Sequence, residues 1–340
     1  MEGPKFDFDF EFEDDFLDDL DEDDDEQQER QLEAQELLYD GWEVLSEPAD
    51  DPEESFARLE RAEEFFRQAL ELDPRLADAY NGLAEIAVER GELEEAEELY
   101  WQAYRLARAE LGSEEPEAFY WWRQPETRPY MRAREGLGFT YWEEGRYDEA
   151  LAEFEALLRL NPNDNQGIRY LIPPLYQLKG ELERALQAYE EFQERYPQDE
   201  GEPHFLFNWG LALYAAGRPE EAAGKLRRGI FQNLYIAPLL LGRDIHPYPF
   251  RHWTETAEPS YAVGYLHWYG ELWEAEPGAL AFLERLWTDP ELRADIRQYI
   301  RLSRELDATE AKARRAQLIN ARRELERRPP SAALLARLLG

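Results

Sequence analysis

The sequence predicts an all-α fold in which about five helix pairs stack into an α-solenoid and further helices follow at the C-terminus. Three observations predict it. A glycine and an alanine recur five residues apart at four places, bulky apolar residues follow each alanine at helical spacing, and a proline ends several of the second helices. Because one helix pair cannot bury its apolar face alone, neighbouring pairs have to stack.

The repeated turn sets the period of this array. The turn glycines are Gly91, Gly145, Gly180 and Gly217, and the matching alanines are Ala96, Ala150, Ala185 and Ala222. Four residues after each alanine comes a bulky apolar residue, and these are Tyr100, Phe154, Tyr189 and Leu226. An earlier copy lacks the glycine but keeps Ala62 and Phe66. The intervals between the five alanines are 34, 54, 35 and 37 residues, so the long one indicates an insertion, near residues 109–129.

One local feature opposes the pattern. Pro173 and Pro174 fall where the first helix of a pair is expected, and proline inside a helix costs about 3 kcal/mol. We expect a kink or a break there. Either this helix is simply short, or the break widens the groove at that repeat.

The pattern resembles the tetratricopeptide repeat, whose period is about 34 residues. Two segments, PETRPYMRAREGL (125–137) and LNPNDNQGIRY (160–170), and the later segment 258–287 also resemble a bacterial subfamily sometimes labelled similar to suppressor of tumorigenicity seven. That resemblance runs from about residue 119 to 287. It implies a binding scaffold, without naming a ligand or a catalytic residue, and it covers neither end of the chain.

We therefore expect three regions. Residues 1–28 are an acidic, Phe-rich disordered tail, residues 29–236 form the solenoid, and residues 237–340 are a loop followed by helices. The loop, about 237–260, is either a packed connection or a segment that contacts a ligand.

Composition excludes several classes of function. The chain has 76 acidic and 38 basic residues, a net charge of −38, which disfavours direct binding to nucleic acid or to an anionic membrane. It has no cysteine, and its four histidines lack the spacing of metal ligands. We find no phosphate-binding loop and no apolar run long enough for a membrane helix. The sequence therefore predicts a cytoplasmic protein that is not an enzyme and needs no cofactor or metal.

The concave side of the predicted solenoid is the candidate site for a partner. Helical spacing turns a mixed set of aromatic, amide and basic side chains toward it, and these are Asn81, Arg132, Trp142, Gln166, Arg169, Tyr176, His204 and Tyr214. Some of the aromatic residues could instead pack between repeats. Two arginines, Arg132 and Arg169, suggest a pocket for a carboxylate, and the alternative is ordinary ion pairing with the abundant glutamates.

The tail alternates acidic residues with five phenylalanines, which are Phe6, Phe8, Phe10, Phe12 and Phe16. Such a segment either recognises a partner or docks on the chain itself, or it is only a solubilising tail. Residues 291–340 carry 12 basic and 7 acidic side chains and form the one net-basic region. By charge, the tail would contact this region or the arginines of the groove. The region is otherwise a helical cap on the solenoid.

The function predicted from sequence is that of a scaffold or adaptor that binds a protein or peptide in the concave groove. The alternative is an acidic decoy or chaperone-like protein whose N-terminal tail masks a basic partner. Strong salt sensitivity that disappears with the tail would favour the alternative.

Overall fold

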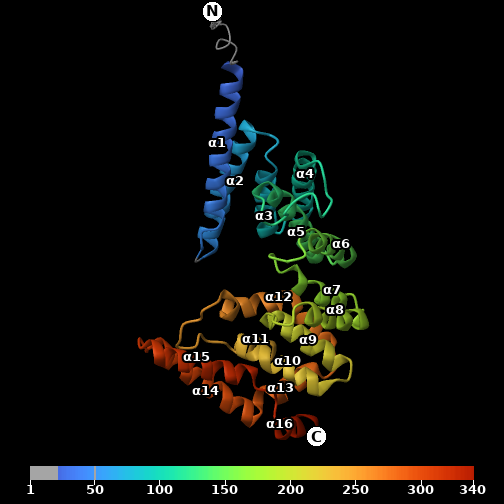
Figure 1. Ribbon diagram of the computed structural model, residues 1–340, viewed down its shortest axis with the longest axis vertical. Helices are drawn as coiled ribbons and strands as arrows, with labels where there is room; N and C mark the ends of the chain where they lie inside the picture. Colours follow the sequence, from blue (N-terminus) through green and yellow to red (C-terminus); the bar gives the residue numbers. More distant parts are fainter. Residues whose placement is uncertain (1–21, 50) are drawn as a thin grey trace, which may run out of the picture. The chain divides into compact units, whose positions relative to one another are not determined.

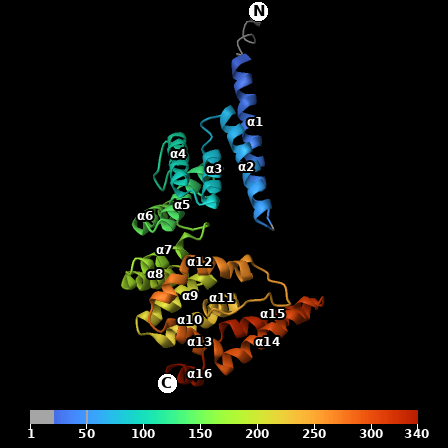
Figure 2. The same cartoon turned by 180° about the vertical axis from the view of Figure 1, so that it is seen from behind.

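The computed structural model describes residues 22–49 and 51–340, and these form sixteen α-helices and no strand (Figures 1 and 2). They divide into two compact units, one ending at Arg146 and one beginning at Tyr147. The helices of the first unit are α1 (Glu22–Leu45), α2 (Pro52–Leu72), α3 (Ala77–Arg90), α4 (Leu93–Leu111) and α5 (Arg128–Glu143). A 3-10 helix, η2 (Pro125–Thr127), precedes α5.

The second unit holds the remaining helices. The first five are α6 (Tyr147–Leu160), α7 (Ile172–Leu178), α8 (Leu182–Arg195), α9 (Pro203–Ala215) and α10 (Pro219–Gln232). The others are α11 (Ile236–Leu240), α12 (Pro259–Ala275), α13 (Ala279–Thr288), α14 (Pro290–Asp307), α15 (Lys312–Arg327) and α16 (Ala332–Leu339). Two 3-10 helices, η3 (Ile168–Tyr170) and η4 (Glu255–Ala257), lie between them. Packing joins consecutive helices into antiparallel pairs, including α1 with α2, α3 with α4, α7 with α8 and α9 with α10.

The repeated turn has the geometry that its glycines require. Gly91 and Gly217 have φ angles of 76° and 71°, in the left-handed region, and Gly145 and Gly180 are close to them at 72° and 74°. A residue with a Cβ is strained there, so glycine ends each first helix. The five alanines of the repeat are all fully buried. The predicted all-α fold of paired helices is confirmed.

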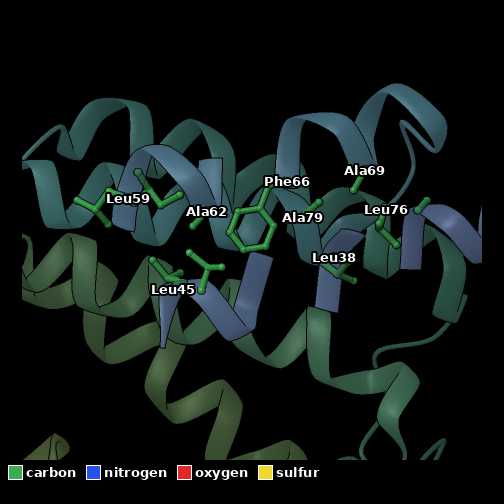
Figure 3. Packing of buried hydrophobic residues seen from close by; sticks show 11 residues of the cluster. Leu38, Leu45, Leu59, Ala62, Phe66, Ala69, Leu76 and Ala79 are labelled. Carbon is green, nitrogen blue, oxygen red and sulfur yellow. The ribbon is translucent and has the colours of Figure 1, made fainter. Parts of the chain in front are cut away.

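Phe66 holds the core of the first unit together. Its ring is fully buried and lies between Gly41 of α1 and Gly82 of α3, where an added Cβ would be 2.7 and 2.3 Å from ring carbons (Figure 3). Tyr100 packs against Gly136 of α5 in the same way, at 2.2 Å from such a Cβ. Gly82 and Gly136 each stand nine positions before a turn glycine. A bulky residue of one pair thus fills the space left by a glycine in the next pair.

The ends of the predicted solenoid differ in detail. Helix α1 begins at Glu22, so it includes residues that we assigned to the tail. The expected insertion corresponds to the segment from Gly112 to Gln124, which contains no helix. This segment packs on the repeats, because Trp121 is buried against the ring of Tyr130 and Glu114 accepts hydrogen bonds from Tyr104 and Tyr130.

The two prolines neither kink nor break a helix, and the alternative that this first helix is simply short is confirmed. Helix α7 begins at Ile172, so Pro173 and Pro174 occupy its first turn, where the backbone N–H groups need no intrahelical partner. The helix is only seven residues long. The residues that precede it in the repeat form a turn and η3 instead of a first helical turn.

In the second unit, one face of α9 is covered by α12 and α13. Phe207 packs on the rings of Tyr265 and Trp273, at centroid distances of 5.7 and 6.3 Å. The Tyr265 hydroxyl donates to Oδ1 of Asn208 and accepts from Nε1 of Trp273, and all three side chains are buried. A polar chain therefore fixes α12 on α9 within an aromatic interface.

The C-terminal helices are tied to α10 by a buried arginine. The side chain of Arg227 is 1% exposed and pairs with Asp295 of α14 at 2.7 Å. It also donates to the backbone carbonyls of Leu325 and Arg328, at the end of α15, and Arg328 pairs with Asp295 at 2.8 Å. One carboxylate thus pairs with two arginines and links α10, α14 and the end of α15.

Aromatic rings anchor part of the segment from Leu241 to Glu258. Tyr248 and His252 both contact the ring of Tyr235, and Phe250 contacts both of them. The Tyr235 hydroxyl accepts a hydrogen bond from the backbone N–H of Tyr248. None of the described helices is long and apolar enough to cross a membrane.

Candidate functional site

A cleft of about 650 Å³ opens in the first unit beside the first helices of three consecutive pairs. We call it the α1–α3–α5 cleft. Its lining residues are Gln27, Gln31, Gln35, Leu38, Asp73, Arg75, Leu76, Ala77, Asp78, Leu106, Glu110, Pro125, Glu126, Arg128, Pro129 and Arg132. Most of these side chains are polar, and acidic and basic groups are nearly balanced. That balance contrasts with the strongly acidic chain as a whole.

Three glutamines form a ladder along the cleft. Gln27, Gln31 and Gln35 lie four residues apart on α1 and are all exposed. Four residues of an α-helix rise about 6 Å, while two residues of an extended chain span about 6.6 Å. A glutamine amide carries both a donor and an acceptor. The ladder therefore matches the N–H and C=O groups of every second residue of an extended peptide.

Arg132 joins the three helices that frame the cleft. It lies on α5, pairs with Asp78 of α3, and its guanidinium lies 5.0 Å from the ring centroid of Trp42 on α1. The side chain remains 38% exposed. Arg132 therefore stabilises the wall of the cleft, and its side chain is still partly accessible to solvent.

Asn81 lies beneath this wall. It is fully buried on α3, and its Nδ2 donates to Oδ1 of Asp78 at 3.0 Å and to the carbonyl of Pro129 at 2.9 Å. Because Pro129 is in the first turn of α5, Asn81 fixes the start of α5 against α3. Its role in the structure is to position two lining residues, Asp78 and Pro129, and not to face the cleft directly.

Glu85 places a titrating group behind the same wall. Burial is the main cause that raises the pKa of its carboxyl to about 7; Arg132 opposes this shift, and nearby acidic groups, including Asp78, contribute to it. The carboxyl is thus partly protonated near neutral pH. The charge of this region therefore responds to pH in the range where most exposed glutamates do not.

Two further arginines of the cleft form no ion pair with a described residue. Arg75 and Arg128 are both exposed, and Arg128 lies 5.7 Å from the ring centroid of Trp122. Their guanidinium groups can each offer several N–H donors to a ligand.

Trp142, another predicted groove residue, is buried and stacks on Phe139 with parallel rings 6.3 Å apart. In the second unit, Gln166 lies in the turn before η3, and Arg169 lies within η3. Neither is on a helical groove face, because the prolines delay the start of α7.

Arg169 is held by residues of its own chain. It pairs with Asp164 and Asp199, both at 2.8 Å, and its guanidinium lies 4.3 Å from the ring centroid of Tyr170. Tyr176 is also buried, and its hydroxyl donates to Glu155 and accepts from Arg184. These contacts favour the ion-pairing alternative over a carboxylate pocket at Arg169.

The last two predicted residues face the helices that cover α9. Nδ1 of His204 hydrogen-bonds to the hydroxyl of Tyr261, and its ring stacks on Tyr269 of α12. Burial lowers the pKa of His204 to about 4, so the ring is neutral at physiological pH. The ring of Tyr214 packs on Phe282 of α13 at 4.8 Å. Helices α12 and α13 therefore occupy the face that the sequence assigned to a partner.

Of the eight predicted residues, only Arg132 lines the cleft, and Asn81 is buried behind its wall. The sequence pattern did not point to the glutamine ladder, because Gln27 falls within the predicted tail and amides are weaker indicators of a binding site than aromatic and charged side chains. The signal was present as three glutamines at helical spacing.

The predicted tail site lies outside the described residues, so Phe6, Phe8, Phe10, Phe12 and Phe16 stay a prediction. Several arginines of the basic C-terminal region have partners within the second unit. Arg314 pairs with Glu305 at 2.6 Å, Arg327 pairs with Glu200 at 2.7 Å, and Arg315 donates to the carbonyls of Leu306 and Thr309. These contacts reduce the charge available to attract the tail.

Comparison with known families agrees with the helix pairs. Models of the tetratricopeptide repeat match residues 57–115, 132–164 and 175–233. The chain contains tetratricopeptide repeats. The matched repeats cover the second helix of the first pair and all or part of the four pairs that follow, and no catalytic domain is matched. No curated protein sequence matches the chain significantly.

Two solved structures of repeat-containing chains are similar to this one. One is YrrB, described as a TPR protein with an unusual peptide-binding site, with 26% identity and a TM-score of 0.37 over 52% of this chain and 78% of that chain. The other is PilF of Pseudomonas aeruginosa, with 16% identity and a TM-score of 0.43 over 75% of this chain and 98% of that chain. No match is to the subfamily similar to suppressor of tumorigenicity seven, so that finer assignment stays a prediction.

Proposed function

We propose that the chain is a non-catalytic scaffold that binds an extended segment of a protein partner in the α1–α3–α5 cleft. Tetratricopeptide repeats generally mediate binding of proteins or peptides, which supports the class of function. The glutamine ladder is the observation that carries the choice of site, because its spacing matches an extended backbone. Arg75 and Arg128 add donors for carboxylates or carbonyls of the partner.

The ladder can be tested with peptides selected against the full-length chain from a random library. In fluorescence anisotropy, the double variant Gln31→Ala and Gln35→Ala should bind a selected peptide roughly 10-fold more weakly, because each lost hydrogen bond contributes about 0.5–1.5 kcal/mol. Gln28→Ala is the matched control, since Gln28 is exposed on the same helix but does not line the cleft. Equal affinity of all three proteins would place binding elsewhere.

The extended conformation has its own test. N-methylation of a backbone amide removes one donor. If alternate residues of the peptide face the ladder, methylation should weaken binding strongly at every second position and weakly between them. A helical peptide would instead show sensitivity at intervals of three or four residues.

The acidic-decoy function remains the second candidate, and it rests on the sequence of the tail. Deletion of residues 1–21, which precede α1, should then abolish the salt dependence of binding to a basic partner. Unchanged salt dependence after this deletion would exclude that function and leave the cleft as the site.

A further inference from the structure

A second pocket, of about 310 Å³, lies wholly within the second unit and outside the helices that frame the first cleft. It is bounded by the 250–257 segment, the residues around Pro203, the end of α10, and one face each of α14 and α15. No predicted groove residue lines it. The role of this pocket is therefore a separate question from the proposed function.

Aromatic rings form the walls of this C-terminal pocket. Phe231 and Tyr299 are buried with ring centroids 5.4 Å apart, and Phe250 lies 6.4 Å from Tyr299. Trp253 stands at the rim and is 53% exposed. A flat apolar group can be enclosed by rings on several sides, and it would cover part of an indole that is otherwise in water.

Two polar groups in the walls have unused hydrogen-bonding capacity. Nε2 of Gln232 donates to the carbonyl of Gly201 at 2.9 Å, while its Oε1 is buried and accepts no hydrogen bond from the part of the chain that the structure describes. Nε2 of His252 forms a hydrogen bond with the Tyr235 hydroxyl at 2.8 Å, while its Nδ1 makes no hydrogen bond with a described residue. The pocket thus offers the acceptor of Gln232 and one imidazole nitrogen.

Arg322 is the main polar group of the pocket, and its carboxylate partner is distant. The side chain is only 15% exposed, donates to the hydroxyl of Tyr299, and lies 3.8 Å from Glu326. The carboxylates paired with Arg227, Arg328 and Arg314 lie at 2.6 to 2.8 Å. Burial raises the pKa of Glu326, although Arg322 opposes the shift, so Glu326 neutralises the guanidinium weakly. Most N–H donors of Arg322 have no acceptor among residues 22–49 and 51–340.

We propose that the C-terminal pocket binds a carboxylate joined to a flat apolar group, with Arg322 holding the carboxylate and the rings of Phe250, Tyr299 and Trp253 enclosing the apolar group. An N–H next to the carboxylate would satisfy the free oxygen of Gln232. This chemistry occurs in a small aromatic acid and in the last residue of a peptide chain, and a volume of about 310 Å³ accommodates either.

The proposal can be tested on the full-length chain by isothermal titration with four probes. N-acetylphenylalanine should bind, while N-acetylphenylalaninamide should bind at least 10-fold more weakly because it lacks the carboxylate. Phenethylamine should not bind. Equal binding of acid and amide, stronger binding of the amine, or no binding of the acid at several millimolar would each overturn the proposal. The amine result would show that Glu202 and Glu326 select a cation instead.

Variants locate the site. Arg322→Lys keeps the charge but loses the planar fork of donors, and it should weaken the acid at least 5-fold. Arg314→Lys is the control, because Arg314 lies on the same helix and pairs with Glu305 away from the pocket. Trp253→Ala is a second test that does not depend on a buried group, and it should also weaken the acid. Unchanged affinity in both Arg322→Lys and Trp253→Ala would refute the assignment.

The fourth probe, 3-phenylpropionate, and a hexapeptide with its amidated form show whether the site is suited to a small acid or to the end of a peptide chain. If 3-phenylpropionate, which has no N–H, binds as well as N-acetylphenylalanine, the site is suited to a small acid. If a hexapeptide ending in phenylalanine binds more tightly than both, and its amidated form does not, the site is suited to a chain end. Failure of these probes would leave the glutamine ladder untested, since that ladder lies in the other unit.

Discussion

Both units are built from antiparallel pairs of helices. They differ in what packs against the first helix of a pair. In the first unit, Asp78 and Arg132 line an open cleft. In the second, the equivalent face of α9 packs on α12, and His204 and Phe207 contact its tyrosines. Repeat geometry therefore creates a groove-forming face, but a helix from outside the repeats can fill it. A binding site cannot be assigned to such a face until the rest of the chain is placed.

Composition explains why α12 can fill that face. The helix brings three buried tyrosine and tryptophan rings, Tyr265, Tyr269 and Trp273, against aromatic residues of α9. Helix α1, which lines the open cleft, presents glutamines. Aromatic rings gain by leaving water, whereas amides are hydrogen-bonded in water until a ligand replaces it. The covered face is thus a core, and the open face is suited to reversible binding.

The largest expected effect is a loss of stability in the second unit alone, because only that unit depends on the C-terminal helices. Asp295→Ala leaves Arg227 buried without a carboxylate, and it should destabilise the second unit by about 3–5 kcal/mol. Hydrogen exchange should show the loss in α10, α14 and α15 and little change in α1 to α4. Glu305→Ala, which removes an exposed ion pair with Arg314, should cost under about 1 kcal/mol. Equal losses from both variants would contradict the buried network.

The polar anchor of α12 is the next test. Tyr265→Phe leaves Oδ1 of Asn208 and Nε1 of Trp273 buried without a partner, which should cost about 2 kcal/mol in urea unfolding. Tyr39→Phe serves as control, because Tyr39 is exposed on α1 and should have almost no effect. If the two substitutions had the same effect, the cover on α9 would be held by apolar packing alone.

Alanine substitutions at two glycines should change stability by smaller amounts and in opposite directions, because only the glycine in the first unit is closely packed. Gly82→Ala places a Cβ against the ring of Phe66 and should destabilise by about 1–2 kcal/mol, after the better helix propensity of alanine is subtracted. Gly224→Ala on α10 meets no atom within 4 Å and should stabilise by up to about 1 kcal/mol. Adding Phe66→Leu should rescue Gly82→Ala in part. Thermal melting of the three variants measures both signs.

The last test is the pH dependence of the stability of the first unit. The pKa of Glu85, raised to about 7 by burial, exceeds its ordinary value of 4.5, so the folded state binds the proton more tightly than the unfolded state. The stability contributed by this group should therefore be greatest below pH 4.5 and be lost as pH rises to about 7. Glu85→Gln should remove most of that loss in urea unfolding at pH 5 and 8. Glu94→Gln, on an exposed residue, should not.

Local patterns in the sequence were sufficient to predict the fold. The five buried alanines, the left-handed turn glycines and the insertion follow from spacing, which depends on residues close in the chain. Site residues depend on partners far away in sequence. Arg132 meets Asp78 across 54 positions, and Arg227 meets Asp295 across 68. Spacing shows that an arginine faces a neighbour, but it does not show which carboxylate is already there.

The same limit explains the remaining differences. His204 and Tyr214 do lie on α9, as the helical pattern indicates, but the sequence does not show that α12 returns to cover them. Pro173 and Pro174 were placed inside a helix because the period was assumed to be uniform. Their fixed φ angles instead favour the first turn of a short helix, which moves Gln166 and Arg169 into the preceding turn.

Arg132 gives the first unit a further property, since it contributes to the electrostatic environment of Glu85. A carboxylate of a bound peptide near Arg132 would offset the positive charge that now lowers the pKa of Glu85. The carboxyl would then take up part of a proton from solution on binding. Calorimetry in buffers of different ionisation enthalpy would detect this uptake. The association constant would consequently rise as the medium becomes more acidic near neutrality, so peptide and hydrogen ion would act as coupled ligands.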